Sequence, residues 1–311
     1  MRFIQSAKYQ GLQSLLLFKA KGNSIFAKRA VAKQKCPNGY SQKTESNQPM
    51  KKIGSLIRTI LFRSLSLENY LMVLSKAYFF AFNTGILKLS KSFEYPYFIK
   101  HLIKPGDVVL DIGANLGYLT VLFSKLVGET GKVHAVEPVG PVRNVLRQNT
   151  KRLKNIQIYP FALGAENTTI QLGNNTRIKK GYMGSGSHFV LENNAALGLG
   201  IDIVSEAEMR RGSQLFRGLD QLHFVKCDIE GFETVVLPEM KSLINRFKPI
   251  LLVETAGAKR KQMLDFFSRN GFEAFVLDDG KLLSTNEKES RDIVFIHSDK
   301  LNNTINKYIH R

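Results

Sequence analysis

The pattern of apolar and polar positions in this 311-residue chain changes near residue 93. From there on, short apolar runs alternate with longer stretches in which apolar residues recur every three or four positions. The short runs predict strands and the longer stretches predict helices. The predicted strands are 107–112, 132–137, 156–161, 222–228, 249–255, 272–278 and 291–297, and the predicted helices are 117–128, 141–152, 231–246 and 258–270. Strands that are apolar along their whole length are covered on both faces, so the alternation predicts one doubly wound α/β domain.

The chain before this domain has a different character. Residues 37–50 are polar and rich in turn-forming residues, and a second amphipathic segment begins at Met50. The hypothesis is that the residues before Met50 are a basic upstream extension. The run 66–87 is long and helical in pattern, but Lys76 lies at its middle, where a charge costs about 2.5–3.5 kcal/mol on membrane insertion. A helix packed on the core is therefore predicted, and contact with a membrane face stays open. The predicted divisions are an extension at 1–49, an amphipathic helical segment at 50–92, the α/β domain at 93–298 and a polar tail at 299–311.

The net charge of +19 is concentrated in the N-terminal part of the chain. Residues 1–106 hold 18 Lys and Arg against three acids, whereas the remainder holds 27 against 23. An enzyme that acts on nucleic acid more often carries a basic patch on its folded body, so a nucleic-acid partner is disfavoured. The two cysteines, Cys36 and Cys227, form no disulfide framework. A reducing compartment is expected, which indicates the cytoplasm, and the basic arm leaves the inner face of a membrane open.

The residues with the most chemical potential follow the ends of the predicted strands. The first strand runs into DIGANLG (111–117), the second ends at Glu137, and the fourth runs into Asp228-Ile229-Glu230-Gly231. In open α/β sheets ligands bind beyond the carboxyl ends of the strands. Glu137 lies 20 residues beyond Gly117, and an acid at this place can accept hydrogen bonds from both hydroxyls of a ribose. The alternative is a solvated carboxylate at a strand end.

The glycine turn indicates which ligand it holds. Asn115 stands where the dinucleotide fingerprint G-x-G-x-x-G requires a glycine, and only a pyrophosphate needs that close approach to the backbone. Asp111 would repel a phosphate but suits a cationic ligand. S-adenosylmethionine carries a ribose, an ammonium and a sulfonium but no phosphate, so the turn favours this cofactor. An NAD-dependent dehydrogenase and a non-catalytic binding module on a membrane surface remain as alternatives.

An ordered set of motifs resembles the FkbM family of methyltransferases. The set is DIGANLGYLT (111–120), AVEP (135–138), ALG (162–164), GSGS (184–187), VKCDIEGFE (225–233) and PILLVE (249–254). The match covers roughly residues 93–298. The resemblance implies a Rossmann-like class I methyltransferase fold, with a seven-stranded, mostly parallel sheet whose last strand is antiparallel and helices on both faces. It also implies S-adenosylmethionine-dependent O-methylation of a glycan, lipid-linked saccharide or other small metabolite.

The resemblance also assigns residues by position. It places Asp111, Gly113, Asn115 and Gly117 at the methionine portion of the cofactor and its loop, Glu137 at the ribose, and Phe161 and Ala162 at the adenine. Asp228 and Glu230 would face the reacting centre or the ammonium of the cofactor.

Methylation of a hydroxyl requires a group that removes its proton, which accelerates such reactions roughly 10²–10⁴-fold. The candidates are Asp228, which ends a strand, Glu230, and His188, which follows the GSGS stretch. Glu230 has the alternative role of stabilising a helix start. Two carboxylates alone make a poor magnesium site, so no metal is expected. Residues 174–220 are expected to shape the acceptor pocket, but their sequence does not identify the acceptor.

Overall fold

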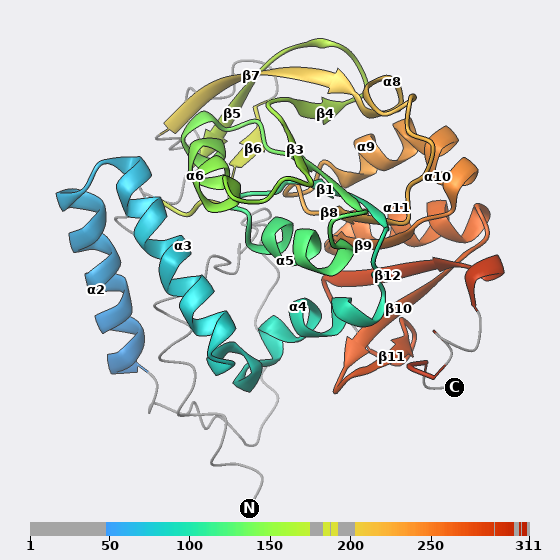
Figure 1. Ribbon diagram of the computed structural model, residues 1–311, viewed down its shortest axis with the longest axis horizontal. Coiled ribbons are helices and arrows are strands. Elements are labelled where there is room, and N and C mark those ends of the chain that lie inside the picture. The colour runs from blue at the N-terminus through green and yellow to red at the C-terminus, as the bar shows by residue number, and fades with distance from the viewer. Residues whose placement is uncertain are drawn as a thin grey trace, which may run out of the picture.

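The computed structural model describes residues 48–174, 183–186, 188–191, 203–288, 290–301, 305 and 307–309 (Figure 1). The expectations for residues 1–47, and for much of the predicted acceptor region at 174–220, lie outside the described residues.

The main sheet has eight strands. Their order across the sheet is β11-β10-β12-β9-β8-β1-β2-β3. The five strands from β9 to β3 run parallel to one another, and β12 is antiparallel to both of its neighbours. In this order β1 has β2 on one side and β8 on the other. The order of the strands therefore reverses at β1, and in open α/β sheets ligands bind at such a switch point. The bounds are β1 (Val108–Ile112), β2 (Lys132–Val136), β3 (Ile156–Tyr159), β8 (Phe224–Cys227), β9 (Ile250–Glu254), β10 (Phe272–Asp278), β11 (Lys281–Ser284) and β12 (Asp292–His297).

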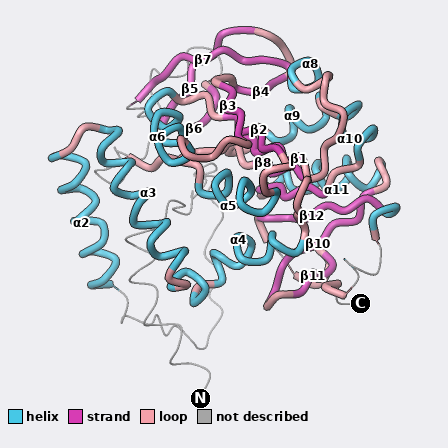
Figure 2. Tube along the Cα trace, in the orientation of Figure 1, coloured by secondary structure: helices cyan, strands magenta, loops and turns pink. Residues whose placement is uncertain are grey.

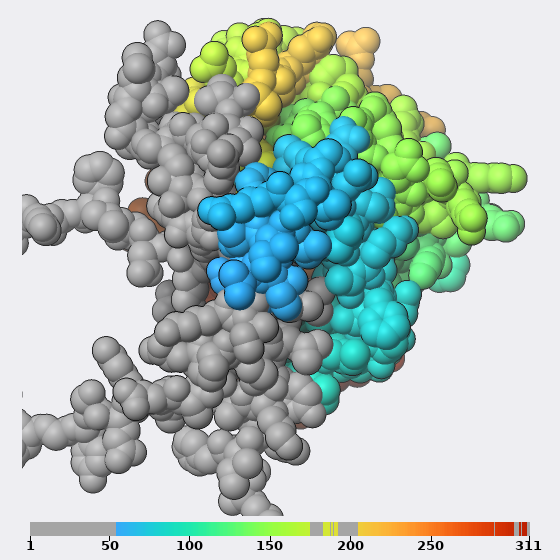
Figure 3. Space-filling model, turned by 90° about the vertical axis from the view of Figure 1, so that its left-hand side faces the viewer, coloured from blue at the N-terminus to red at the C-terminus, as the bar shows by residue number. Residues whose placement is uncertain are grey.

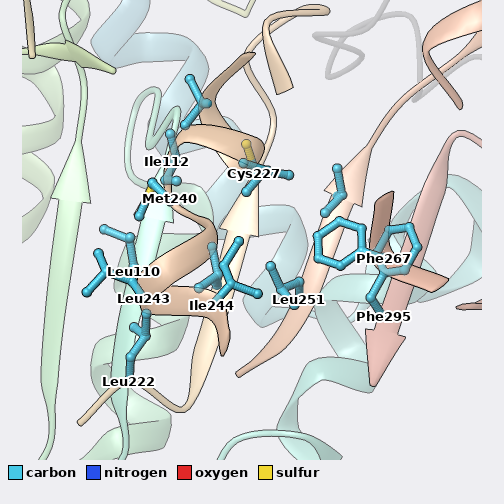
Figure 4. Close-up of a cluster of buried hydrophobic side chains, with 14 of the residues drawn as sticks. Leu110, Ile112, Leu222, Cys227, Met240, Leu243, Ile244, Leu251, Phe267 and Phe295 are labelled. Carbon is cyan, nitrogen blue, oxygen red and sulfur yellow. The ribbon is translucent and has the colours of Figure 1, made fainter. Parts of the chain in front are cut away.

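Helices cover both faces of this sheet (Figures 1 and 2). One face packs against α4 (Glu94–Phe98), α5 (Tyr118–Val127) and α6 (Gly140–Thr150), and the other against α9 (Glu233–Glu239), α10 (Lys241–Phe247) and α11 (Gly257–Arg269). Alternate strand residues serve the two faces: Val109 faces the first, and Leu110 and Ile112 face the second. Figure 4 shows the second face, where side chains of β1, β8 and β9 meet those of α10 and α11. Burial on both faces explains why the central strands are mostly apolar.

The N-terminal helices form a separate layer beside α6. They are α2 (Gln48–Ser64) and α3 (Leu67–Asn83), and the short elements η2 (Ile86–Leu89), η3 (Lys91–Phe93) and η4 (Ile99–His101) connect them with α4 to the sheet. Ser66 caps α3 by accepting a hydrogen bond from the backbone of Asn69. Tyr70 and Leu71 of this helix are fully buried against the body of the domain. The predicted helix at 66–87 is thus packed on the core, and no helix in the described part of the chain is long and apolar enough to cross a membrane.

A second, four-stranded sheet is inserted between β3 and β8. It consists of β4 (Ala162–Gly164), β5 (Thr168–Asn174), β6 (His188–Val190) and β7 (Ile203–Arg211), in the order β4-β7-β5-β6. In β7, Ala207 and Met209 are buried while Glu206 and Glu208 are exposed. This alternation is typical of a sheet with one solvated face. After β7, α8 (Gly212–Leu215) leads back to the main sheet.

The predicted fold class is confirmed, and so is the antiparallel last strand. All seven predicted strands are present in the main sheet, but the predicted number was too low because β11 forms a hairpin with β10. The inserted sheet was not predicted. The last residues, predicted as a polar tail, also contribute to the fold: Ile305 is buried, and Ile309 forms a bridge with Leu282.

Candidate active site

A pocket lies at the carboxyl ends of β1, β2 and β8, with the inserted sheet as its opposite wall. It is open on one side, and about 840 Å³ of space lies within it and at its open mouth. Eight of the ten residues predicted for the site line it: Gly113, Asn115, Glu137, Phe161, Ala162, His188, Asp228 and Glu230. The other two, Asp111 and Gly117, are not among its lining residues.

The turn after β1 is held close to the ends of the two neighbouring strands. The backbone N–H groups of Gly113 and Ala114 both donate to the carbonyl oxygen of Val136, at 3.0 and 2.9 Å. Gly113 has φ 77°, and a Cβ atom at this position would lie 2.1 Å from the carbonyl oxygen of Asp228. A side chain is therefore excluded here by both backbone conformation and space. Asn115 also adopts a left-handed conformation, φ 54°, which asparagine tolerates better than most residues.

Glu137 fixes this turn and faces the pocket. Its Oε2 accepts a hydrogen bond from the backbone of Asn115 at 2.8 Å, and its Oε1 accepts one from the backbone of Val139 at 3.0 Å. Burial raises the pKa of Glu137 to about 7, although these two bonds oppose the rise. A carboxylate has about four acceptor positions. The two that the backbone does not use remain available to hydroxyl groups of a ligand in the pocket.

Asp111 lies beneath the turn rather than in the pocket. Its side chain is fully buried, its Oδ2 accepts a hydrogen bond from Thr120 Oγ1 at 2.6 Å, and its Oδ1 lies 3.7 Å from Lys226 Nζ. Burial raises the pKa of Asp111, while the nearby Lys226 opposes the rise. The sequence predicted that this acid contacts the cofactor. In the structure it anchors the turn, because a lysine of the neighbouring strand already faces it.

Lys226 is the most informative residue that the sequence did not single out. Its ammonium group donates to the carbonyl oxygen of Gly113 at 2.6 Å and lies 3.7 Å from carboxylate oxygens of both Asp111 and Asp228. Its side chain is only 9% exposed. A charged residue inside the apolar strand FVKC was the available signal, since buried charges are costly unless they are paired.

Gly117 serves packing rather than ligand contact. It precedes α5 with φ 87°, and a Cβ atom there would lie 2.7 Å from Leu146 Cδ1 of α6. The Gly117→Ala variant is expected to lose about 1–2 kcal/mol to left-handed strain and about 1–3 kcal/mol more to overpacking. Gly280→Ala is the matched control, because Gly280 also has a positive φ but open space around it. Urea denaturation measures both losses, and an equal loss in the two variants would contradict the packing role.

The inserted sheet brings Phe161, Ala162 and His188 to the opposite wall. One face of the Phe161 ring is covered by the guanidinium group of Arg210, 5.3 Å from the ring centroid. The ring nitrogens of His188 contact Ser185 O at 3.2 Å and Asn174 Nδ2 at 3.4 Å. Burial lowers the pKa of His188 to about 4. This histidine is therefore neutral near pH 7 and a weak proton acceptor.

Asp228 and Glu230 occupy different parts of the turn after β8. The Asp228 side chain is 23% exposed and lines the pocket beside Lys226. Glu230 is exposed and has φ 54°, and Gly231 follows with φ 99°. The turn is closed by Glu233, whose Oε1 accepts hydrogen bonds from the backbones of Ile229 and Gly231, both at 3.0 Å. Of the two predicted carboxylates in this turn, Asp228 is thus the less exposed one, and it follows β8 directly.

Comparison with known proteins identifies the family of the chain. A model of the Methyltransferase FkbM domain matches residues 111–274, which is more than half of the chain. The protein-L-isoaspartate O-methyltransferase of Methanosarcina mazei is 36% identical over 77 residues, 25% of this chain and 28% of that protein. A probable cobalt-precorrin-6B C(15)-methyltransferase (decarboxylating) of Saccharolobus solfataricus is 34% identical over 93 residues, 29% of this chain and 45% of that protein. The chain thus spans less than half the length of these curated relatives.

Among solved structures, the FkbM methyltransferase of Methylobacillus flagellatus KT is similar with a TM-score of 0.40 and 13% identity. The similarity covers 80% of this chain and 59% of that one. The fibrillarin of Aeropyrum pernix, solved with natively bound S-adenosyl-L-methionine, is similar with a TM-score of 0.38 and 12% identity, over 63% of this chain and 68% of that one.

Proposed function

The chain belongs to the FkbM family of methyltransferases, and from this premise we propose that it transfers a methyl group from S-adenosylmethionine to a hydroxyl group. The acceptor we propose is a glycan, a lipid-linked saccharide or another small metabolite. The observation that carries the proposal is the meeting of the Gly113 turn, Glu137 and Asp228 in one pocket at the switch point of the sheet. The family assignment leaves no place for the NAD-dependent dehydrogenase considered as an alternative.

The pocket fits the cofactor by the chemistry of its lining. Gly113 allows close approach to the backbone, and Glu137 keeps two acceptor positions for the ribose hydroxyls. Phe161 and Ala162 offer an apolar border for the adenine. When bound, S-adenosylmethionine supplies a methyl group that its sulfonium already activates. The protein therefore has to align the acceptor and remove its proton, and alignment alone supplies much of the acceleration.

Asp228 is proposed as the group that accepts this proton. With S-adenosylmethionine bound, the cofactor would supply the methyl group to the acceptor oxygen, and the Asp228 carboxylate would take up the proton that the hydroxyl loses. Lys226 places a positive charge 3.7 Å from this carboxylate. His188 suits the role less well, because its two ring nitrogens already contact Ser185 O and Asn174 Nδ2.

The proposal is tested by incubating the protein with S-adenosylmethionine and a panel of saccharides and lipid-linked saccharides. The expected result is S-adenosylhomocysteine together with a product heavier by one methyl group. Titration calorimetry with S-adenosylmethionine, with NAD as the negative control, tests the cofactor. Binding of NAD alone would contradict the proposal, and binding of S-adenosylmethionine without turnover of any acceptor would favour a non-catalytic module.

A peripheral membrane contact through residues 50–92 is part of this proposal. Among the described residues, the large apolar side chains that are exposed all lie between residues 56 and 89: Leu56, Ile57, Ile60, Val73, Phe80 and Leu89. Figure 3 shows α2 and α3 side by side on this face. The exposed residues Arg63, Lys76 and Lys88 lie in the same segment. Apolar side chains together with basic ones suit the surface of an anionic bilayer.

Sedimentation with phosphatidylglycerol-containing vesicles tests this contact. Each basic residue at such a surface contributes about 1 kcal/mol, so Lys76→Gln is expected to weaken binding about fivefold. Lys281→Gln is the control, since Lys281 is equally exposed on β11, in another part of the fold. Equal binding to pure phosphatidylcholine vesicles, or equal losses in both variants, would contradict a specific contact with anionic lipid.

A further inference from the structure

The wall of the pocket contains a buried hydroxyl group that has no partner. Ser185 is 3% exposed and lines the pocket, and its Oγ atom makes no hydrogen bond with any of the described residues. Leaving such a group unpaired costs free energy, and native proteins rarely do so. A pocket-lining hydroxyl without a partner in the described part of the chain points to a partner on the ligand.

Neighbouring contacts hold this hydroxyl in place. The Tyr70 hydroxyl of α3 donates to the carbonyl oxygen of Met183 at 3.1 Å, and Asn174 Nδ2 of β5 donates to the carbonyl oxygen of Gly184 at 2.9 Å. His188 Nδ1 lies 3.2 Å from the carbonyl oxygen of Ser185, and this contact holds the residues that follow. The short segment is thus anchored from three elements. These contacts hold the backbone of Ser185 in the wall of the pocket.

The segment passes directly over the glycine turn. A Cβ atom added at Gly186 would lie 3.1 Å from Nδ2 of Asn115, so the amide group of Asn115 and the segment are in contact. The other end of that amide is already used, because Asn115 Oδ1 accepts a hydrogen bond from the backbone of Leu116 at 2.8 Å. The Nδ2 group is therefore the end directed at Gly186. Two neutral donors, a hydroxyl and an amide, consequently line the pocket above the turn.

The charges around the turn indicate what these donors bind. Asp111 and Asp228 flank Lys226 at 3.7 Å each, so this cluster carries one net negative charge when all three groups are ionised. Such a cluster attracts an ammonium group. A carboxylate instead requires donors, and it accepts up to four hydrogen bonds. Acids on one side and neutral donors on the other suit the two charged groups of an α-amino acid.

We infer that Ser185 Oγ and Asn115 Nδ2 bind the α-carboxylate of the methionine portion of the cofactor. This inference rests on the proposed function, because it assigns a role within the cofactor site. It extends the part of the cofactor site that the inserted sheet forms, since Ser185 lies between β5 and β6.

Two ligands that differ in the amino acid test the inference. S-adenosylhomocysteine carries the amino acid, whereas methylthioadenosine keeps the adenosine and the sulfur but lacks it. Titration calorimetry of Ser185→Ala is expected to show about tenfold weaker binding of S-adenosylhomocysteine and unchanged binding of methylthioadenosine. Ser205→Ala is the matched control, because Ser205 Oγ is also buried without a partner but Ser205 does not line the pocket. It should change neither affinity.

The Asn115→Asp variant supplies an independent check. Aspartate keeps the shape and tolerates the left-handed backbone, but it replaces the amide donor with a negative charge. It should weaken S-adenosylhomocysteine binding more than Ser185→Ala does and spare methylthioadenosine. Equal losses for both ligands, or no loss in Ser185→Ala, would overturn the inference. Failure of the unaltered protein to bind either ligand would instead overturn the proposed cofactor site, and the inference with it.

Discussion

Replacing Asp228 by asparagine is expected to lower turnover with the native acceptor by roughly 10²-fold or more, because the variant keeps the shape of the side chain but loses the proton acceptor. The position of the carboxylate supports this expectation. Asp228 follows β8 directly, lines the pocket, and lies beside the turn through the contact of its backbone with Gly113. Single-turnover kinetics with the methylated product as readout would measure the loss.

The affinity for the cofactor is expected to change far less than turnover in this variant. The net charge of the Asp111, Lys226 and Asp228 cluster changes by one, whereas Glu137 and Phe161 still line the pocket for the rest of the cofactor. Glu230→Gln is the control, since Glu230 is exposed at the rim of the same turn. Normal turnover in Asp228→Asn would remove the assignment as base, and His188 would be the next residue to test.

The main sheet could be predicted from the sequence because its central strands are short and mostly apolar. The hairpin that adds β11 was missed although its signal is present. Asp279 and Gly280 both have positive φ values, and an Asp-Gly pair between apolar runs is typical of a two-residue hairpin turn. The inserted sheet was harder to predict. Its strands β5 and β7 are polar at alternate positions, so they lack the apolar runs that marked the other strands.

The residues of the site also fall into two groups, those that could be located from the sequence and those that could not. Glu137, Asp228 and the glycine turn could be located because they end strands, and strand ends meet at one edge of a parallel sheet. The pairing of Asp111 with Lys226 depends on the register of β1 with β8, in which these two residues are direct partners. Register is set by tertiary packing and is not visible in either strand alone. The same holds for Ser185, whose burial results from contacts with α3 and β5.

Glu137 is expected to make cofactor binding depend on pH. Burial raises the pKa of its carboxyl group from about 4.5 to about 7, and the ionised form offers more acceptor positions to the ribose hydroxyls. Affinity for S-adenosylmethionine should therefore rise from pH 6 to pH 8, and binding near pH 7 should release a proton. Calorimetry in two buffers of different ionisation enthalpy would detect this proton.

The stability of the ligand-free protein should also depend on the Glu137 carboxyl group. In this case a rise in pH should lower the free energy of unfolding, whereas it should raise the affinity for the cofactor. The folded pKa lies above the ordinary value, so the folded state binds the proton more tightly than the unfolded state does. The stabilisation from Glu137 is complete below about pH 4.5 and is lost as the pH rises through about 7. Denaturation of the free protein between pH 5 and 8 should show this loss, and Glu137→Gln should flatten the profile.

The Glu137→Gln variant is expected to bind S-adenosylmethionine about 10–100-fold more weakly, since hydrogen bonds to a charged group contribute about 1.5–3 kcal/mol. Its remaining affinity should no longer depend on pH between 6 and 8. Glu254→Gln is the matched control, because Glu254 is also a buried acid at the end of a strand but faces Arg291 and does not line the pocket. An unchanged affinity in Glu137→Gln, or an equal loss in both variants, would show that Glu137 holds only the turn. Its two backbone contacts would then be its whole role.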